Sequence, residues 1–254
     1  MEGVVSFFPR KPLLLQTTRS WDFMGFSETV KRNPSGEIDI IIGVIGTGIW
    51  PKLESFNDEG NDPLPKKCKG ACEGGSNFTC NKNPQAKILK SEVVKSVGDP
   101  VTPDFSSRGP SSIIAYIIKP DISAPGVGIL AGYPPILPPS GLHGLDKRSV
   151  KYNLMTGTSV ACAHAAGAAA YVKSFHPYWS PSTVKSAVDY RISKTLTFSW
   201  NDFTICAGCK DADLFFSLLC IAWPMNSTIN PDGEFAFGTG HIDPVKAIYP
   251  GLVY

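Results

Sequence analysis

Ser159 is the residue of this chain that is best placed for nucleophilic chemistry. It follows the short apolar run Leu154-Met155 and a tight Gly157-Thr158 turn, and it opens an alanine-rich stretch that predicts a helix. At such a strand-to-helix turn the hydroxyl is exposed and the first-turn amides have no intrahelical acceptor. The positive end of the helix dipole stabilises an oxyanion there. The pattern therefore predicts a serine nucleophile of the kind that acyl transfer uses.

A serine nucleophile needs a neighbouring imidazole to accept its proton, so the four histidines are the candidate bases. His143 precedes Ser159 but lies in a loop rich in Pro and Gly, where we do not expect it to serve the serine. His164 lies five residues past Ser159, which places it about 500° round the helix and on another side. We interpret His164, His176 and His241 as structural or surface histidines.

The sequence around Ser159 carries a family resemblance. Residues 157–167 read Gly-Thr-Ser-Val-Ala-Cys-Ala-His-Ala-Ala-Gly. They resemble the nucleophile motif of subtilisin-like serine proteases, and in particular that of the plant cucumisin-like subtilases. Further blocks resemble the same family in the same order, at residues 1–26, 40–50, 104–127, 171–181 and 225–254.

The resemblance implies an α/β fold, which in this chain would be an incomplete subtilisin-like parallel sheet with flanking helices. The 22 prolines and 24 glycines predict that it is rich in loops. It also implies a serine endopeptidase that hydrolyses polypeptide substrates through an acyl-enzyme on Ser159. Such an enzyme uses a triad in the chain order Asp, His, Ser and needs no cofactor and no metal.

Two members of that triad are missing from the sequence. The apolar run 40–45 predicts a buried parallel strand, and Gly46 stands where the family carries its aspartate. After residues 77–82 the chain passes almost at once to 86–90, which resembles a much later region. We interpret this as an internal deletion near 83–86 that removes the histidine helix, the substrate-binding strands and the oxyanion asparagine.

These losses predict a serine endopeptidase by family that is inactive in this chain. Two alternatives stay open: a non-catalytic interaction module that binds a protease or a substrate, and a gene-model fragment without function. Residues 1–18 resemble the end of a propeptide, and 19–254 a truncated catalytic domain. Within it, about 189–223 form an unrelated Phe/Ser/Cys-rich insert, which we interpret as translated intron. We expect residues 224–254 to return to the outer layer.

Local signals predict two consecutive helices after the serine. The first stops at His176-Pro177, because proline cannot continue a helix. Ser180-Pro181 predicts an N-cap followed by a first-turn proline, which opens the second helix.

Composition excludes several classes of function. With 43% hydrophobic and 18% charged residues the chain is not globally disordered. A net charge of +2, without a basic cluster among aromatics, argues against nucleic-acid binding. The apolar stretch 214–223 is too short to span a membrane, so we expect no membrane segment.

The cysteines and sequons indicate a secreted protein. Asn77 and Asn226 begin N-glycosylation sequons, and the resemblance implies a disulfide between Cys72 and Cys80. The family implies an extracellular or cell-wall location, whereas the start of this chain does not resemble a signal peptide. Cys206 and Cys209 have no second matched pair, so we expect no zinc site.

Overall fold

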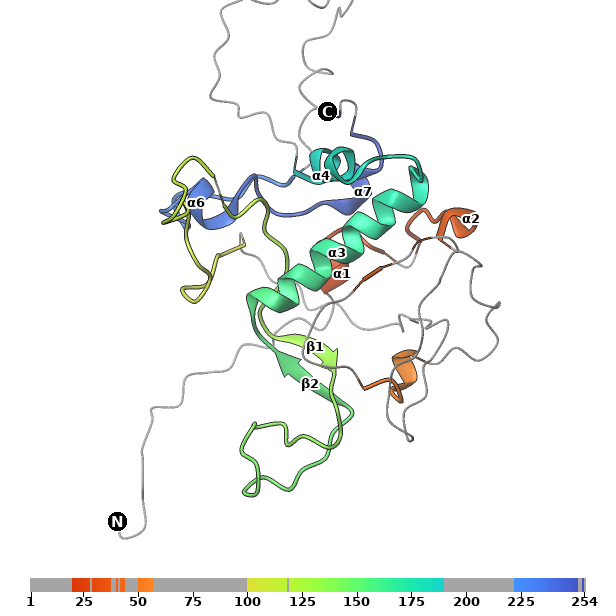
Figure 1. Ribbon diagram of the computed structural model, residues 1–254, viewed down its shortest axis with the longest axis vertical. Coiled ribbons are helices and arrows are strands. Elements are labelled where there is room, and N and C mark those ends of the chain that lie inside the picture. The colour runs from red at the N-terminus through yellow and green to blue at the C-terminus, as the bar shows by residue number, and fades with distance from the viewer. Residues whose placement is uncertain are drawn as a thin grey trace, which may run out of the picture.

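The computed structural model describes residues 20–27, 29–37, 40, 42–43, 50–56, 100–117, 119–189, 222–250 and 253. Among these residues short helices surround one long helix, and a single two-stranded sheet lies at one end of it (Figure 1). The elements in chain order are α1 (Ser20–Phe23), α2 (Pro34–Glu37), the 3-10 helix η1 (Glu54–Phe56), β1 (Ile129–Gly132), β2 (Tyr152–Met155), α3 (Thr158–Phe175), α4 (Pro181–Asp189), α6 (Glu234–Phe237) and α7 (Pro244–Ala247).

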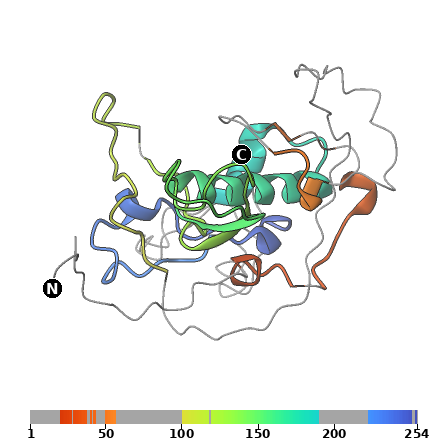
Figure 2. The same ribbon diagram turned by 90° about the horizontal axis from the view of Figure 1, so that it is seen from below.

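The long helix α3 runs through the middle of the described structure (Figure 2). Seven of its 18 residues are alanine, which has the highest helix propensity of all residues. Ala168 and Val172 are buried one turn apart, so one face of the helix packs inward. No helix of the described residues, α3 included, is both long enough and apolar enough to cross a bilayer.

The two helix boundaries predicted after the serine are confirmed. α3 ends at Phe175, where the backbone N–H of His176 donates to the Val172 carbonyl. α4 begins at Pro181, and the Thr183 N–H donates to Ser180 Oγ at 3.1 Å, so Ser180 is the predicted N-cap.

The main core lies between α3, α4, α7 and the N-terminal segment. Its buried members are all apolar, and burying one large side chain of this kind contributes roughly 1.5–3 kcal/mol. They are Met24, Ala168, Val172, Val184, Ala187, Val188, Ile242, Ala247 and Ile248. The C-terminal segment 222–250 therefore supplies core residues. The reason is its apolar content, since Phe237, Ile242 and Ile248 are each at most 2% exposed.

The N-terminal segment 20–37 is bound along α3 at several points. Asn33 Nδ2 donates to the Ser174 carbonyl at 2.7 Å, and the Tyr171 hydroxyl donates to the Lys31 carbonyl at 2.8 Å. Phe26 packs edge-on against the Tyr171 ring, with 4.7 Å between centroids. These contacts tie residues about 140 positions apart in the sequence into one unit.

The sheet described here is an antiparallel hairpin and not the predicted parallel sheet. Ile129 pairs with Met155 and Gly132 with Tyr152, and loop 133–151 joins the two strands. Ile40, Ile42 and Gly43 of the predicted parallel strand are not in a strand, and Ile42 is 55% exposed. A parallel strand needs hydrogen-bonded neighbours, and the described residues offer it none. Within the described residues, parallel pairing is limited to one bridge, between Ser123 and His241.

His241 joins several of these segments and is only 4% exposed. Its backbone pairs with Ser123 and Trp223, its ring meets the Phe23 ring edge-on, and its Nδ1–H donates to the Ile242 carbonyl. Burial lowers the pKa of His241 to about 4, because the imidazolium would lose its hydration.

We predict that this histidine makes the fold sensitive to acid. In the unfolded chain a histidine has a pKa near 6.5. Between that pH and about 4 the unfolded state therefore binds a proton at this histidine that the folded state does not bind. The free energy of unfolding should fall as the pH drops from 6.5 toward 4, by up to about 3 kcal/mol. Urea titrations at pH 7, 6 and 5 measure this slope.

The variant H241Q should lose most of the slope, whatever its stability at pH 7. H143Q removes an imidazole from an exposed loop and is the matched control. A wild-type protein with equal stability at pH 7 and pH 5 would contradict the prediction.

Candidate functional site

Ser159 is the second residue of α3 and its side chain is exposed. β2 leads into it through Thr156 and Gly157, so the predicted strand-turn-helix arrangement is present (Figure 1). The Gly157 carbonyl accepts the backbone N–H groups of Val160 and Ala161, at 3.1 and 3.3 Å. No side chain caps the helix start. The Thr158 and Ser159 amides are therefore the ones that face an anion at this end of the helix, since the Gly157 amide already has a partner.

The turn before Ser159 is held by the loop that leads into β1. The Gly157 N–H donates to the Gly126 carbonyl at 2.8 Å, and the Gly128 N–H donates to Thr156 Oγ1 at 2.9 Å. Gly126 approaches the helix closely, because a Cβ on it would lie 2.9 Å from the Gly157 oxygen and 3.0 Å from the Ala161 Cβ. The loop therefore fixes where α3 begins.

A cavity of about 560 Å³ lies beside the start of α3. Loops 100–106 and 119–129 form much of its wall, and α3 contributes Thr158, Ala161, Cys162 and Ala165. Ser159 is not among the lining residues, because it lies on a different side of the helix from that face. The predicted nucleophile and the cavity therefore do not coincide.

His164 is engaged away from Ser159. Its Nδ1 lies 3.0 Å from the Val160 carbonyl, one turn earlier in α3, and its Nε2 lies 2.7 Å from Ser20 Oγ. Both ring nitrogens thus have partners, and neither partner is Ser159. The expectation that His164 lies on another side of the helix is confirmed.

The remaining histidines are also placed elsewhere. His176 donates from Nε2 to the Ile248 carbonyl at 2.8 Å and stacks on the Trp179 ring. His241 is buried, as described above, and His143 is exposed on the loop between the strands. All four histidines and Ser159 lie within the described residues, and no hydrogen bond joins any of them to the serine.

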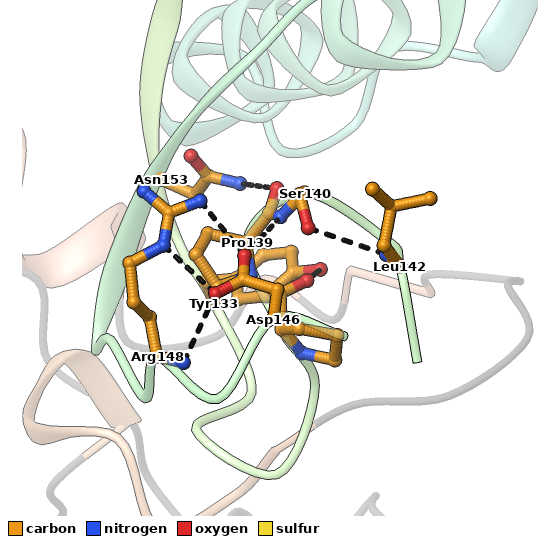
Figure 3. A network of polar contacts seen from close by, with 8 residues as sticks. Tyr133, Pro139, Ser140, Leu142, Asp146, Arg148 and Asn153 are labelled. Atoms are coloured by element: carbon orange, nitrogen blue, oxygen red, sulfur yellow. Dashed lines mark hydrogen bonds and ion pairs between the residues drawn. The ribbon is translucent and has the colours of Figure 1, made fainter. Parts of the chain in front are cut away.

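The loop that carries His143 has its own polar network, shown in Figure 3. Asp146 is its centre: Arg148 binds both carboxylate oxygens, and the Ser140 N–H donates to one of them. These hydrogen bonds, led by that of Arg148, lower the pKa of the Asp146 carboxyl. Asn153 Nδ2 donates to the Pro139 carbonyl and ties the loop to β2.

This network keeps His143 at the far end of the hairpin from Ser159. β2 is four residues long and runs from the loop toward α3, which separates the two by roughly 13 Å of strand. Figure 1 shows the loop projecting away from the helix. His143 is therefore no base for Ser159 in this arrangement.

Comparison with known proteins identifies the lineage of this serine helix. A sequence profile described as the subtilase family matches residues 93–195. The chain belongs to the subtilase family.

Several plant proteases are similar to this subtilase. Subtilisin-like protease SBT4.3 of Arabidopsis thaliana is 47% identical over 172 residues, which cover 67% of this chain and 20% of the relative. SBT4.6 of the same plant is 44% identical over 176 residues, covering 68% and 19%. SBT4.10 is 27% identical over 476 aligned positions, covering the whole of this chain and 64% of the relative. The chain thus spans about a fifth of the length of the first two relatives.

Several residues singled out in the sequence of this subtilase lie outside the described residues. They are Gly46, Cys72, Asn77 and Cys80, together with most of the proposed insert. Of the cysteines within the described part, Cys162 is free and exposed. The described residues hold no group of His, Cys, Asp and Glu that could bind a metal ion.

Asn226 is exposed and lies at the start of a turn. Its Oδ1 accepts the Thr228 N–H at 2.8 Å, which closes the sequon on itself as an Asx-turn. The described chain resumes just before it, where Ala222 is buried and Trp223 exchanges two backbone hydrogen bonds with His241. These two residues at the end of the predicted insert therefore take part in the fold.

Sequence reasoning about this subtilase missed Ser20 as a partner of His164. Ser20 is buried and is the first residue of α1, 144 positions before the histidine. No spacing rule could join two residues so far apart. The only local signal was the family-like character of the block 1–26, which indicates ancestry and not contact.

We predict opposite effects for alanine at two glycines of this site. G126A should destabilise the fold by about 1–3 kcal/mol, because the added methyl group meets the Gly157 oxygen and Ala161. G167A is the matched control in the middle of α3, where a Cβ meets nothing within 4 Å. It should stabilise the fold by about 0.5–1 kcal/mol through helix propensity. Urea midpoints measure both, and equal shifts would contradict the close approach at Gly126.

Proposed function

We propose that this chain is a serine endopeptidase by descent that does not hydrolyse peptide bonds through Ser159. The observation that carries the proposal is that none of the four imidazoles of the chain reaches the Ser159 hydroxyl. A serine without a neighbouring base is almost wholly protonated near neutral pH and is a poor nucleophile. The strand, turn and helix at Ser159 then keep the backbone arrangement of the family's nucleophile, but the hydroxyl does not react as a nucleophile.

The cavity supports the same conclusion. Productive attack requires the substrate carbonyl to lie within about 3–3.5 Å of the nucleophilic oxygen. The space beside the start of α3 is bounded by the face that carries Thr158, Ala161 and Cys162, and Ser159 does not line it. A peptide bound in that cavity would not meet the serine oxygen.

The sequence supplies the second line of support. Gly46 stands in for the triad aspartate, and a glycine cannot orient an imidazole. In subtilisin the loss of the histidine alone lowers turnover by about 2 × 10⁶, and the loss of the aspartate alone by about 3 × 10⁴. A chain that lacks both, together with the segments that bind substrate, would retain no measurable peptidase activity.

The domain organisation that goes with this proposal has two segments, and the second contains a deletion and an insert. Residues 1–18 are a propeptide remnant, 19–254 a truncated catalytic domain, and the deletion near 83–86 accounts for the missing histidine. The alignment with SBT4.10 supports a deletion, because it spreads 254 residues over 476 positions. The insert of about 189–223 is less separate than its composition indicates, since Ala222 is buried and the Trp223 backbone pairs with that of His241.

The family also indicates where such a protein would act. Its members cleave polypeptides, so a polypeptide would be the substrate if the missing parts were supplied, and the location would be extracellular or in the cell wall. The exposed Asn226 is the glycosylation site that the described structure favours, because its sequon lies on a turn at the surface.

We predict that purified chain leaves fluorogenic peptide libraries uncleaved at pH 5 to 8. The reason is the absence of a proton acceptor at Ser159, so S159A should give the same background rate as the wild type. Release of fluorophore above that background, lost in S159A, would show that a base exists and would refute the proposal. Cleavage that persists in S159A would point to a contaminating protease.

A further inference from the structure

Among the residues that the structure describes, the side-chain hydroxyl that meets an imidazole is that of Ser20. Its Oγ lies 2.7 Å from His164 Nε2, which is hydrogen-bond distance for a nucleophile and its base. Ser20 is the first residue of α1 and is 4% exposed, and His164 lies two turns into α3. The pair therefore forms where the N-terminal segment packs on the long helix.

The second nitrogen of His164 decides which way the pair is protonated. Nδ1 lies 3.0 Å from the Val160 carbonyl oxygen, and a carbonyl can only accept a hydrogen bond. Nδ1 therefore carries the proton of the neutral ring, and Nε2 is left as the acceptor that faces Ser20. A backbone carbonyl thus orients the imidazole as a carboxylate does in a serine protease triad.

Ser20 also lies beside a cavity. It lines the cavity of about 560 Å³ beside α3, a volume in the range of small-molecule sites. Much of the surrounding wall is apolar, with Phe23, Val101, Ile122 and Met225 among its residues. Ser20 is thus among the residues that line this cavity, whereas Ser159 is not.

We propose that Ser20 and His164 form a nucleophile–base pair that reacts with small activated acyl or phosphonyl compounds in this cavity. With a fluorophosphonate, the Ser20 oxygen forms a bond to phosphorus as the P–F bond breaks. The Ser20 proton passes to His164 Nε2 and fluoride leaves with the electron pair of the broken bond. With an activated ester, the Ser20 oxygen forms a bond to the acyl carbon as the ester C–O bond breaks, and the leaving alkoxide takes the proton from His164 Nε2 and departs as the alcohol.

This reactivity is independent of the family's site. It uses neither Ser159 nor the positions of the missing triad aspartate and histidine. The compound that reacts is a small apolar electrophile and not an extended peptide. The two serines can therefore be compared directly within one protein. Ser159 lies in the family motif and has no hydrogen bond to an imidazole, whereas Ser20 lies outside that motif and meets His164.

The test is to treat the full chain with an alkyl fluorophosphonate and to locate the adduct by peptide mass spectrometry. The adduct should appear on Ser20 and not on Ser159. S159A should keep the label and S20A should lose it. H164Q should slow labelling by at least about 100-fold, because a positioned general base contributes 10²- to 10⁴-fold. H176Q, which removes another histidine bonded to a backbone carbonyl, is the matched control and should keep the wild-type rate.

Folding is checked separately, because S20A leaves the His164 nitrogen without its partner in a partly buried site. Thermal melts of each variant make that check, and the adduct position in the unmodified wild type needs no variant. Wild-type chain that carries no adduct on Ser20 overturns the inference and leaves the proposed function intact. An adduct on Ser159 overturns the proposed function, and the rate in H164Q then still decides whether His164 serves Ser20.

Discussion

The face of α3 that carries Ala168 and Val172 is buried against α4, which follows it directly in the sequence, and against two distant segments, residues 20–37 and α7. A single helix of small residues can have several neighbours at once, because alanine allows close approach from each of them. The described structure depends on this burial. When the face packs, the start of the helix, the N-terminal segment and the C-terminal segment all take fixed places around it.

The same helix explains why Ser159 and His164, the histidine nearest to it in the sequence, do not meet. A side chain on a helix points in a direction set by its position, and five residues carry His164 well past the direction of Ser159. The segments packed on α3 then determine what each side chain meets. Ser159 faces outward beside a turn fixed by Gly126 and Gly128, whereas His164 faces the docked N-terminal segment and meets Ser20.

Charge and burial also characterise the region around the contact between Ser20 and His164. His241 lines the same cavity as Ser20, and burial lowers the pKa of His241 to about 4. A cavity bounded by apolar loops, a buried neutral histidine and a serine paired to an imidazole is chemically unlike an extended peptide-binding cleft.

Local signals in the sequence were sufficient for the strand, turn and helix at Ser159, for the end of α3 and for the Ser180 cap of α4. Each of these depends on residues within a few positions of one another. The sequence alone also placed His164 away from the serine, because helix geometry is fixed. The Ser20 contact, the cavity, the burial of Ile242 and Ile248 and the antiparallel pairing of β1 with β2 were decided by tertiary structure. These features join segments up to 144 residues apart, and their free energy comes from packing that no local pattern records.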